Sequence, residues 1–190
     1  MTGPATLHSY PWKVLRGDYI RAALGAATGI GGLVAVGPGV VGWGFLGVGL
    51  LFLYFAIRTG LRQCVTYRLT GTALQRSNKV RLFEGLFARP VQLSWRDLKT
   101  VKLRYYSTKR DKTDGWMQLS LRADGARLGI ESTIDGFDDI VAQTARAIAR
   151  NDIEVSDTTL ANFAALGVSL SAARDEIAKN AAGTKEGGQG

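Results

Sequence analysis

The chain has 190 residues, with 24 Lys and Arg against 16 Asp and Glu, and a net charge of +8 at pH 7. Its single cysteine, Cys64, excludes an intrachain disulfide and therefore a disulfide-stapled secreted fold. The charge is uneven, because residues 61–112 carry 13 Lys/Arg and 3 Asp/Glu whereas residues 113–190 carry 7 and 12. No nucleic-acid-binding motif accompanies the bases, so we expect no nucleic-acid partner.

Residues 1–17 form a polar lead-in that contains Tyr10, Trp12, Lys13 and Arg16. Aromatic and basic side chains favour the boundary between membrane and water. We therefore expect an interfacial segment at headgroup level, with one helical turn beginning at Pro11. The segment and the residues after it lack the small-residue cleavage site of a signal peptide.

An uncharged run of 36 residues follows, from 22 to 57. One membrane span needs about 20 apolar residues, and Gly37-Pro38-Gly39 interrupts the run. The sequence therefore predicts a transmembrane helical hairpin over residues 18–60, with spans at about 19–36 and 40–57. Basic residues flank both ends and the turn has none, so the positive-inside rule places both termini and the remaining chain in the cytoplasm, with the hairpin in the inner (cell) membrane.

Glycines are frequent in both predicted spans. Small residues let two helix backbones approach closely in lipid. Since residues 22–57 carry no charged side chain, we expect the glycines to pack the two helices together rather than to line a pore. The candidate helix-packing residues are Gly25, Gly29, Gly32, Gly42 and Gly47.

After residue 64 the apolar residues alternate, as in half-buried strands. Strands are predicted over 65–69, 73–80, 91–95, 98–106, 116–121 and 128–130, with a bend near Gly85 and turns at Gly71-Thr72 and Asp124-Gly125. An amphipathic helix is predicted over 134–149. Its apolar stripe consists of Ile134, Phe137, Ile140, Val141, Thr144, Ala145 and Ile148. Trp95 and Trp116 are expected to fill the core.

Short antiparallel strands followed by one helix can close a small barrel that the helix covers. The segments 67–70 and 91–98, leading into Val101, and the helix that contains Phe137 resemble bacterial pleckstrin-homology (PH-like) domains, many of which follow one or two membrane helices. The resemblance covers residues 61–150, and the charged loop 107–114 departs from it. The expected fold class is α+β with membrane helices: a transmembrane hairpin, then a PH-like small antiparallel β-barrel capped by a helix.

Two short helices are expected in residues 151–182, the first begun by Ser156 and ended by Gly167, the second begun by Ser169. Residues 183–190 are expected to form a disordered tail. The first helices after residue 150 have an apolar side that would pack on the domain or on a partner.

Catalytic patterns are missing from the sequence. The only histidine, His8, falls in the polar lead-in, and no metal-binding Cys/His pair, P-loop or GxSxG is present. We therefore expect a protein that is not an enzyme and that uses no cofactor or metal. Cys64 follows the predicted hairpin, where it either becomes acylated or simply opens the first strand.

The basic residues divide into two sets. Arg58, Arg62 and Arg68 satisfy the topology rule. A second set is the candidate surface for anionic headgroups or for a partner, although a charge-protected strand edge would look the same. This set consists of Arg76, Lys79, Arg81, Arg89, Lys109, Arg110 and Lys112.

The resemblance and the hairpin together imply an interaction module anchored in the inner membrane. Such a module would scaffold or regulate a membrane complex, with another membrane protein and anionic membrane lipids as partners. The alternatives are an anionic-lipid-responsive sensor and a small accessory subunit of a transporter. A homo-oligomer remains open.

Overall fold

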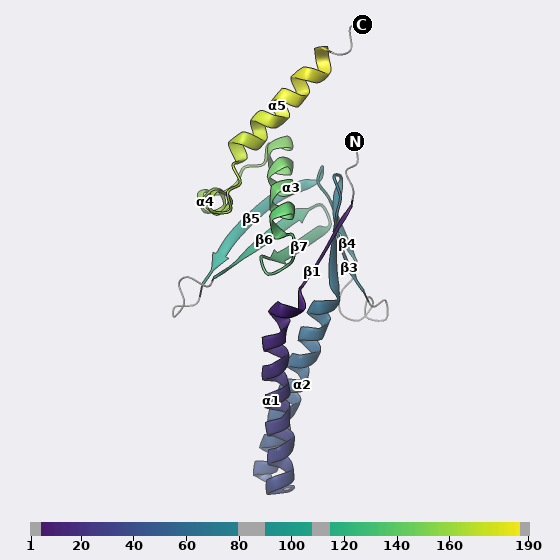
Figure 1. The fold of residues 1–190 in the computed structure, drawn as a ribbon, viewed down its shortest axis with the longest axis vertical. Coiled ribbons are helices and arrows are strands. Elements are labelled where there is room, and N and C mark those ends of the chain that lie inside the picture. Colours follow the sequence, from purple (N-terminus) through teal and green to yellow (C-terminus); the bar gives the residue numbers. More distant parts are fainter. Residues whose placement is uncertain (1–4, 80–89, 108–114, 187–190) are drawn as a thin grey trace.

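The computed structural model describes residues 5–79, 90–107 and 115–186. Two long helices, α1 (Trp12–Val36) and α2 (Val40–Cys64), extend from one end of an α+β domain (Figure 1). Each has 25 residues and is long and apolar enough to cross a membrane. Only 11% of the most apolar stretch of either helix is buried, so neither is the core helix of a soluble domain.

The two helices form an antiparallel pair joined by the turn at residues 37–39. Gly29 and Gly49 meet at the closest approach of the pair, where a Cβ on Gly29 would overlap the Gly49 backbone. Large apolar side chains point away from this contact. Leu24, Trp43 and Leu51 are 65%, 66% and 63% exposed.

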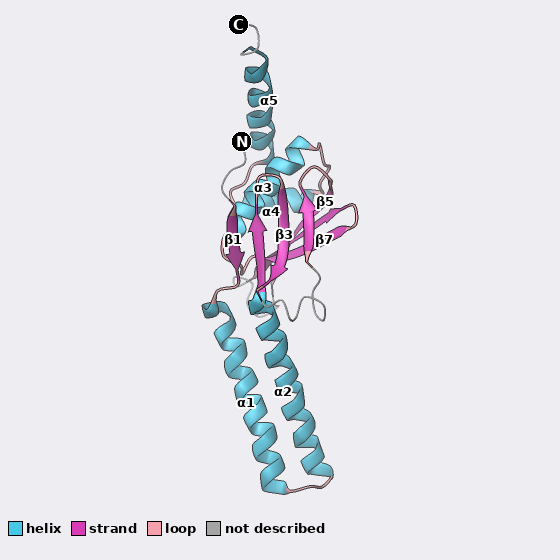
Figure 2. Cartoon of the chain, turned by 90° about the vertical axis from the view of Figure 1, so that its right-hand side faces the viewer, coloured by secondary structure: helices cyan, strands magenta, loops and turns pink. Residues whose placement is uncertain are grey.

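Within the described residues, seven strands build two antiparallel sheets (Figure 2). The first sheet has the order β1-β2-β3-β4 and consists of β1 (Thr6–Ser9), β2 (Val65–Leu69), β3 (Ala73–Asn78) and β4 (Val91–Ser94). The second has the order β5-β6-β7 and consists of β5 (Leu98–Tyr106), β6 (Trp116–Ala123) and β7 (Ala126–Glu131). The expected turns at residues 71–72 and 124–125 connect paired strands.

Strand β1 belongs to the domain sheet although it precedes the helical hairpin in the sequence. It precedes the helices in sequence, yet it pairs with β2, which follows them, with Thr6 opposite Leu69 and Ser9 opposite Thr66. The helical hairpin is therefore an insertion between two neighbouring strands of one sheet. The sequence analysis described residues 1–17 as a polar lead-in without a strand. The structure has a strand over residues 6–9. Helix α1 begins directly after Pro11, where a helical turn was expected.

Alternation along the strands places one apolar core between the two sheets. Leu119 and Leu121 of β6 are fully buried, whereas Arg122 is exposed. Trp95 is 1% exposed and its indole Nε1 donates a hydrogen bond to the Thr70 carbonyl at 2.9 Å, as a buried indole requires. Tyr10 and Leu15 belong to the same core. The lead-in to α1 and its first turns are therefore part of the domain.

Helix α3 (Phe137–Arg150) covers this core, and every residue of its expected apolar stripe is buried. Two further helices follow, α4 (Asp157–Ala165) and α5 (Leu170–Glu186). Ser156 begins α4 as expected, since its hydroxyl oxygen accepts a hydrogen bond from the Thr159 amide. Helix α5 continues to Glu186, four residues into the expected disordered tail. Residues 187–190 lie outside the described residues.

The two sheets are not closed into the barrel that the sequence suggested. In the described part of the chain, no strand ladder joins them. Side chains reach one carbonyl on each outer edge of the three-stranded sheet. The Asn162 amide nitrogen donates to the Leu103 carbonyl of β5 at 2.7 Å, and the Tyr67 hydroxyl donates to the Gly129 carbonyl of β7 at 3.2 Å.

Candidate functional site: the pocket between the helices and the domain

The connections between the hairpin and the domain are very short. Two residues, Tyr10 and Pro11, separate β1 from α1, and β2 begins at Val65, directly after the last residue of α2. The Lys79 amide donates to the Cys64 carbonyl at 2.7 Å, which extends the β2–β3 pairing to the end of the helix. The helices are therefore joined to the sheet without a linker at either end.

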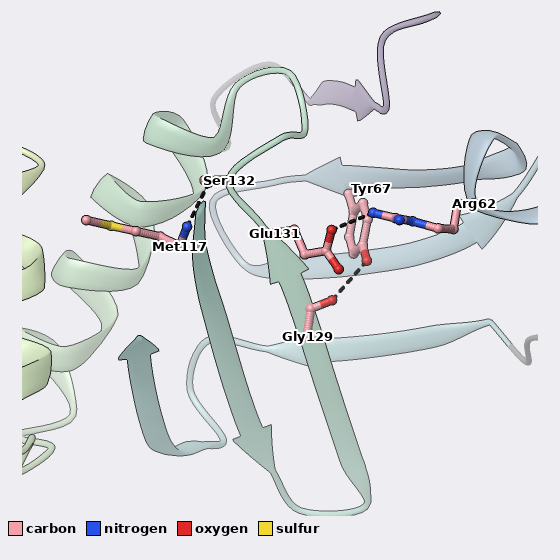
Figure 3. A network of polar contacts seen from close by, with 6 residues as sticks. All are labelled: Arg62, Tyr67, Met117, Gly129, Glu131 and Ser132. Carbon is pink, nitrogen blue, oxygen red and sulfur yellow. Dashed lines mark hydrogen bonds and ion pairs between the residues drawn. The ribbon is translucent and has the colours of Figure 1, made fainter. Parts of the chain in front are cut away.

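Arg62, in the last turn of α2, ties the hairpin to both sheets. Its Nη2 atom lies 2.5 Å from Oε2 of Glu131, the last residue of β7 (Figure 3). Its guanidinium carbon also lies 5.3 Å from the centre of the Tyr10 ring, within range of a cation–π interaction. Tyr67 of β2 is joined nearby to the Gly129 carbonyl. We call Tyr10, Arg62, Tyr67 and Glu131 the Arg62 cluster.

Burial makes the two tyrosines of this cluster resist ionisation. Burial raises the pKa of the Tyr67 hydroxyl well above its usual value, and the nearby Tyr10 adds to the increase. The pKa of Tyr10 is raised by burial first and by the Glu131 carboxylate second, while Arg62 partly opposes the shift. Both phenols therefore remain neutral hydrogen-bonding groups at physiological pH.

A pocket of about 680 Å³ opens beside the Arg62 cluster. Helix α2 contributes Tyr54, Ile57, Arg58 and Leu61, and the domain contributes Val65, Arg76 and Asn78 together with the cluster. The lining of this junction pocket therefore combines apolar side chains of α2 with three arginines, Arg58, Arg62 and Arg76, and one carboxylate, Glu131.

The pocket lies where the headgroups of a membrane around the hairpin would lie. Arg58 is the first charged residue after the uncharged run, and β2 begins seven residues later. Helix α2 rises about 10 Å over that interval. The headgroup layer of each leaflet is about 5–8 Å thick. With a membrane around the hairpin, Arg58 and Arg62 would fall at the depth of lipid phosphates, and the apolar side chains of α2 before Arg58 would fall at the depth of the acyl chains.

Only part of the candidate basic set lies in the described part of the chain. Arg76 lines the junction pocket, and Lys79 is an exposed residue just after β3. The other candidates, Arg81, Arg89, Lys109, Arg110 and Lys112, lie outside the described residues. Arg58 and Arg62, which the sequence analysis assigned to topology alone, line the pocket together with Arg76. The sequence could have shown that Arg58 and Arg62 lie beside Tyr54, because residues 54, 58 and 62 share one helix face.

The candidate glycines differ in whether they lie at a close contact within the hairpin. A Cβ on Gly25 or Gly32 would overlap a phenylalanine ring of α2, and one on Gly29 would overlap the α2 backbone. Gly42 faces the carbonyl of Gly37 in the turn of the hairpin. Gly47 has open space where a side chain would project, so it lies outside the contact it was expected to make. Gly49, which the sequence analysis did not select, lies opposite Gly29.

Three other side chains differ from expectation. His8 lies in β1 rather than in an unstructured lead-in; it is 6% exposed and contacts the backbone at Gly136. Trp116 was expected in the core but is 40% exposed, and its ring stacks on Tyr106. Cys64 ends α2 rather than opening the first strand, and it lines the junction pocket as a free thiol.

Comparison with family models, curated proteins and solved structures gives no match to this chain. The resemblance to PH-like domains therefore stays a prediction from the residue pattern.

Proposed function

We propose that this protein is a membrane-anchored interaction module, in which α1 and α2 span the membrane and hold the α+β domain against its surface. The single observation that carries the proposal is the exposed apolar surface of a helix pair joined at both ends to one sheet. Burying that apolar surface in hydrocarbon removes it from water. The short connections then fix the distance of the domain from the bilayer.

The PH-like assignment of the domain is part of the proposal. Four antiparallel strands, then three, then a helix over the core support it, with the membrane hairpin inserted between the first two strands. The flanking bases favour an inner membrane with the domain and both termini in the cytoplasm. The module would scaffold or regulate a membrane complex through another membrane protein.

The membrane location and orientation are tested by labelling intact spheroplasts. In a Cys64→Ser background, Pro38→Cys places a thiol in the hairpin turn and Asp124→Cys places one in the exposed β6–β7 turn. A membrane-impermeant maleimide should label position 38 in intact cells and position 124 only after lysis. A full chain that stays in the supernatant without detergent, folded and monomeric, would overturn the proposal.

The interaction role has its own test. Crosslinking and affinity capture from native membranes should recover one membrane protein in constant ratio to the full chain. The capture is compared with a chain in which the hairpin is kept and β5–β7 are removed. Equal recovery by both chains would assign the contact to the helices and would favour an accessory subunit of a larger membrane protein.

The junction pocket favours a second function, response to anionic lipids. Arginines at headgroup depth beside apolar side chains of α2 fit a lipid phosphate and its acyl chains. The Arg58→Ala/Arg76→Ala variant should bind anionic lipid about 30-fold more weakly, since each base near such a surface contributes about 1 kcal/mol. Arg122→Ala/Arg127→Ala removes the same charge from the far end of the second sheet and is the control. Equal binding by the two variants would contradict a lipid site in the pocket.

A further inference from the structure

The three-stranded sheet has an outer face that the core does not use. Leu103, Leu119 and Ile130 point inward and are fully buried. The alternate residues therefore point outward on the side opposite α3. In register, the outward positions nearest the β5–β6 tip are Lys102, Arg104 and Tyr106 on β5 and Trp116, Gln118 and Ser120 on β6.

One contact shows which way this face is turned. Glu131 pairs with Gln118 and therefore lies on the same outer face. Its carboxylate reaches Arg62 in the last turn of α2. The outer face is thus turned toward the end of the domain from which the helices extend, and β5 ends at that level (Figure 1).

Two bases lie at the helix end of this face. Lys102 and Arg104 are exposed and make no ion pair within the described ranges, and Glu131, the acid nearest to them on the face, is held by Arg62. At the tip, the rings of Tyr106 and Trp116 are stacked with centroids 5.7 Å apart, and Trp116 stays 40% exposed. The face therefore combines two exposed bases with a stacked aromatic pair.

We propose that this outer face, formed by Lys102, Arg104, Tyr106 and Trp116, docks on the anionic lipid surface beside the hairpin. The docking rests on the proposed membrane location. Lys and Arg are attracted to anionic headgroups, and Trp and Tyr prefer the interfacial layer because one part of each ring is apolar and another is polar. The domain base starts about 10 Å from the hydrocarbon edge, just outside that layer, so the long side chains at the tip can reach into it.

This docking gives the domain two separate attachments to the membrane. The hairpin holds the domain through the short connections at the Arg62 cluster, and the contact at the β5–β6 tip adds a second point that resists tilting of the domain away from the membrane. The docking strength depends on the anionic lipid content, so the composition of the membrane would set how the domain is presented to a partner. The junction pocket is a different site, made by other residues.

The test uses the full chain in nanodiscs, with a fluorophore on one cysteine in a Cys64→Ser background. Ser107→Cys reports on the tip next to Tyr106. Asp124→Cys is the matched control, at the other end of β6 and about 26 Å along the strand. A nitroxide attached to lipid headgroups should quench the label at 107 severalfold more than the label at 124. The difference should fall when anionic lipid is replaced by zwitterionic lipid.

Charge reversal gives the second arm of the test. Lys102→Glu/Arg104→Glu should remove the extra quenching at position 107, while Arg122→Glu/Arg127→Glu, the same charge change farther from the tip, should leave it. A label at 107 that is quenched no more than one at 124 overturns the docking and leaves the face for a protein partner. A Val48→Cys label in α2 separates the failure of the docking from the failure of the membrane location. Quenching of this label by a deep acyl-chain nitroxide supports the membrane location. Absence of that quenching overturns both the membrane location and the docking.

Discussion

Arg62 on α2 and Glu131 on β7 form an ion pair that joins the helical hairpin to the three-stranded sheet, although 69 positions separate them in the chain. Both side chains keep about a third of their surface exposed. The ring of Tyr10, which leads into α1, covers the guanidinium from another side. One arginine therefore contacts both ends of the hairpin insertion and the second sheet.

We expect a measurable coupling between Arg62 and Glu131. A double-mutant cycle with Arg62→Met and Glu131→Gln should give about 1 kcal/mol, because the pair is partly screened by solvent but has good geometry. The measurement is the free energy of unfolding of the domain in detergent, from denaturant titration. The control pair is Lys99 and Asp124, 2.7 Å apart but far more exposed, whose cycle should give a smaller value. Equal coupling in the two cycles would contradict a structural role for Arg62.

Gly29 and Gly49 should respond differently to the same substitution. A methyl group on Gly29 would overlap the backbone of Gly49, whereas a methyl group on Gly49 would lie 3.6 Å from Gly29, an ordinary contact. Gly29→Ala should therefore destabilise the helix pair by about 1–3 kcal/mol, and Gly49→Ala should be tolerated. Unfolding of the purified chain in detergent measures the difference. Gly31→Ala, where a side chain meets open space, is the neutral control.

Gly136 combines a backbone requirement with a tight contact to β1. Its φ of 67° favours glycine, and a Cβ there would overlap the His8 ring. Gly125 has a similar φ of 71° but open space around it. Gly125→Ala should cost about 1–2 kcal/mol for the left-handed conformation alone, and Gly136→Ala should cost more. A His8→Ala background should reduce only the cost at Gly136. Thermal unfolding of the four variants checks this expectation.

The sequence predicted the local parts of this fold well. Alternation placed Leu119 and Leu121 inward, and Asp124-Gly125 marked a turn, because strand faces and tight turns depend on neighbouring residues. The same alternation groups Trp116 with Gln118 and Ser120 on the outer face. Placing Trp116 in the core, on its size alone, was therefore wrong for a reason the sequence already contained.

The sequence could not predict the long-range parts. Strand β1 has only four residues and pairs with a partner beyond the whole hairpin, so no local pattern marks it. For the junction pocket, Tyr54, Arg58 and Arg62 share a helix face by spacing alone. Glu131 and Tyr10 join them only because the tertiary fold brings together residues from both ends of the domain.

Stability should fall in alkaline solution because of Tyr67 and Tyr10. Their pKa values in the folded state are raised above the ordinary value of about 10, so folding favours the protonated phenols. Their contribution is present in full below about pH 10 and is lost as the pH rises above that value. Tyr67→Phe should lower stability at pH 7 by about 1 kcal/mol, through the lost bond to Gly129, and should flatten the loss above pH 10. Melting temperatures between pH 7 and pH 11 test both parts. An unchanged alkaline slope would contradict burial of Tyr67.

The insertion of the hairpin predicts how to obtain a soluble domain. Tyr19 and Gly60 lie side by side where the helices enter the domain. The Tyr19 hydroxyl also donates a hydrogen bond to the Gln63 side chain of α2 at 2.9 Å. A four-residue Gly/Ser linker spans the 8–10 Å between packed helices. Replacing residues 20–59 by such a linker removes the whole uncharged run and keeps β1, Leu15 and Arg62. We expect a folded protein that is soluble without detergent.

A chain that simply starts at residue 61 should behave differently. It lacks β1, Tyr10 and Leu15, all of which contribute to the domain sheet or core. Loss of a buried leucine such as Leu15 alone costs about 2–5 kcal/mol, which is a large part of the 5–15 kcal/mol that stabilises an ordinary domain. Circular dichroism melts should show a cooperative transition for the linker variant, a lower one for the same variant with Leu15→Ala, and none for the truncated chain. A truncated chain as stable as the linker variant would show that β1 and the first turns of α1 are only peripheral to the domain, and the hairpin would then be a leader rather than an insertion.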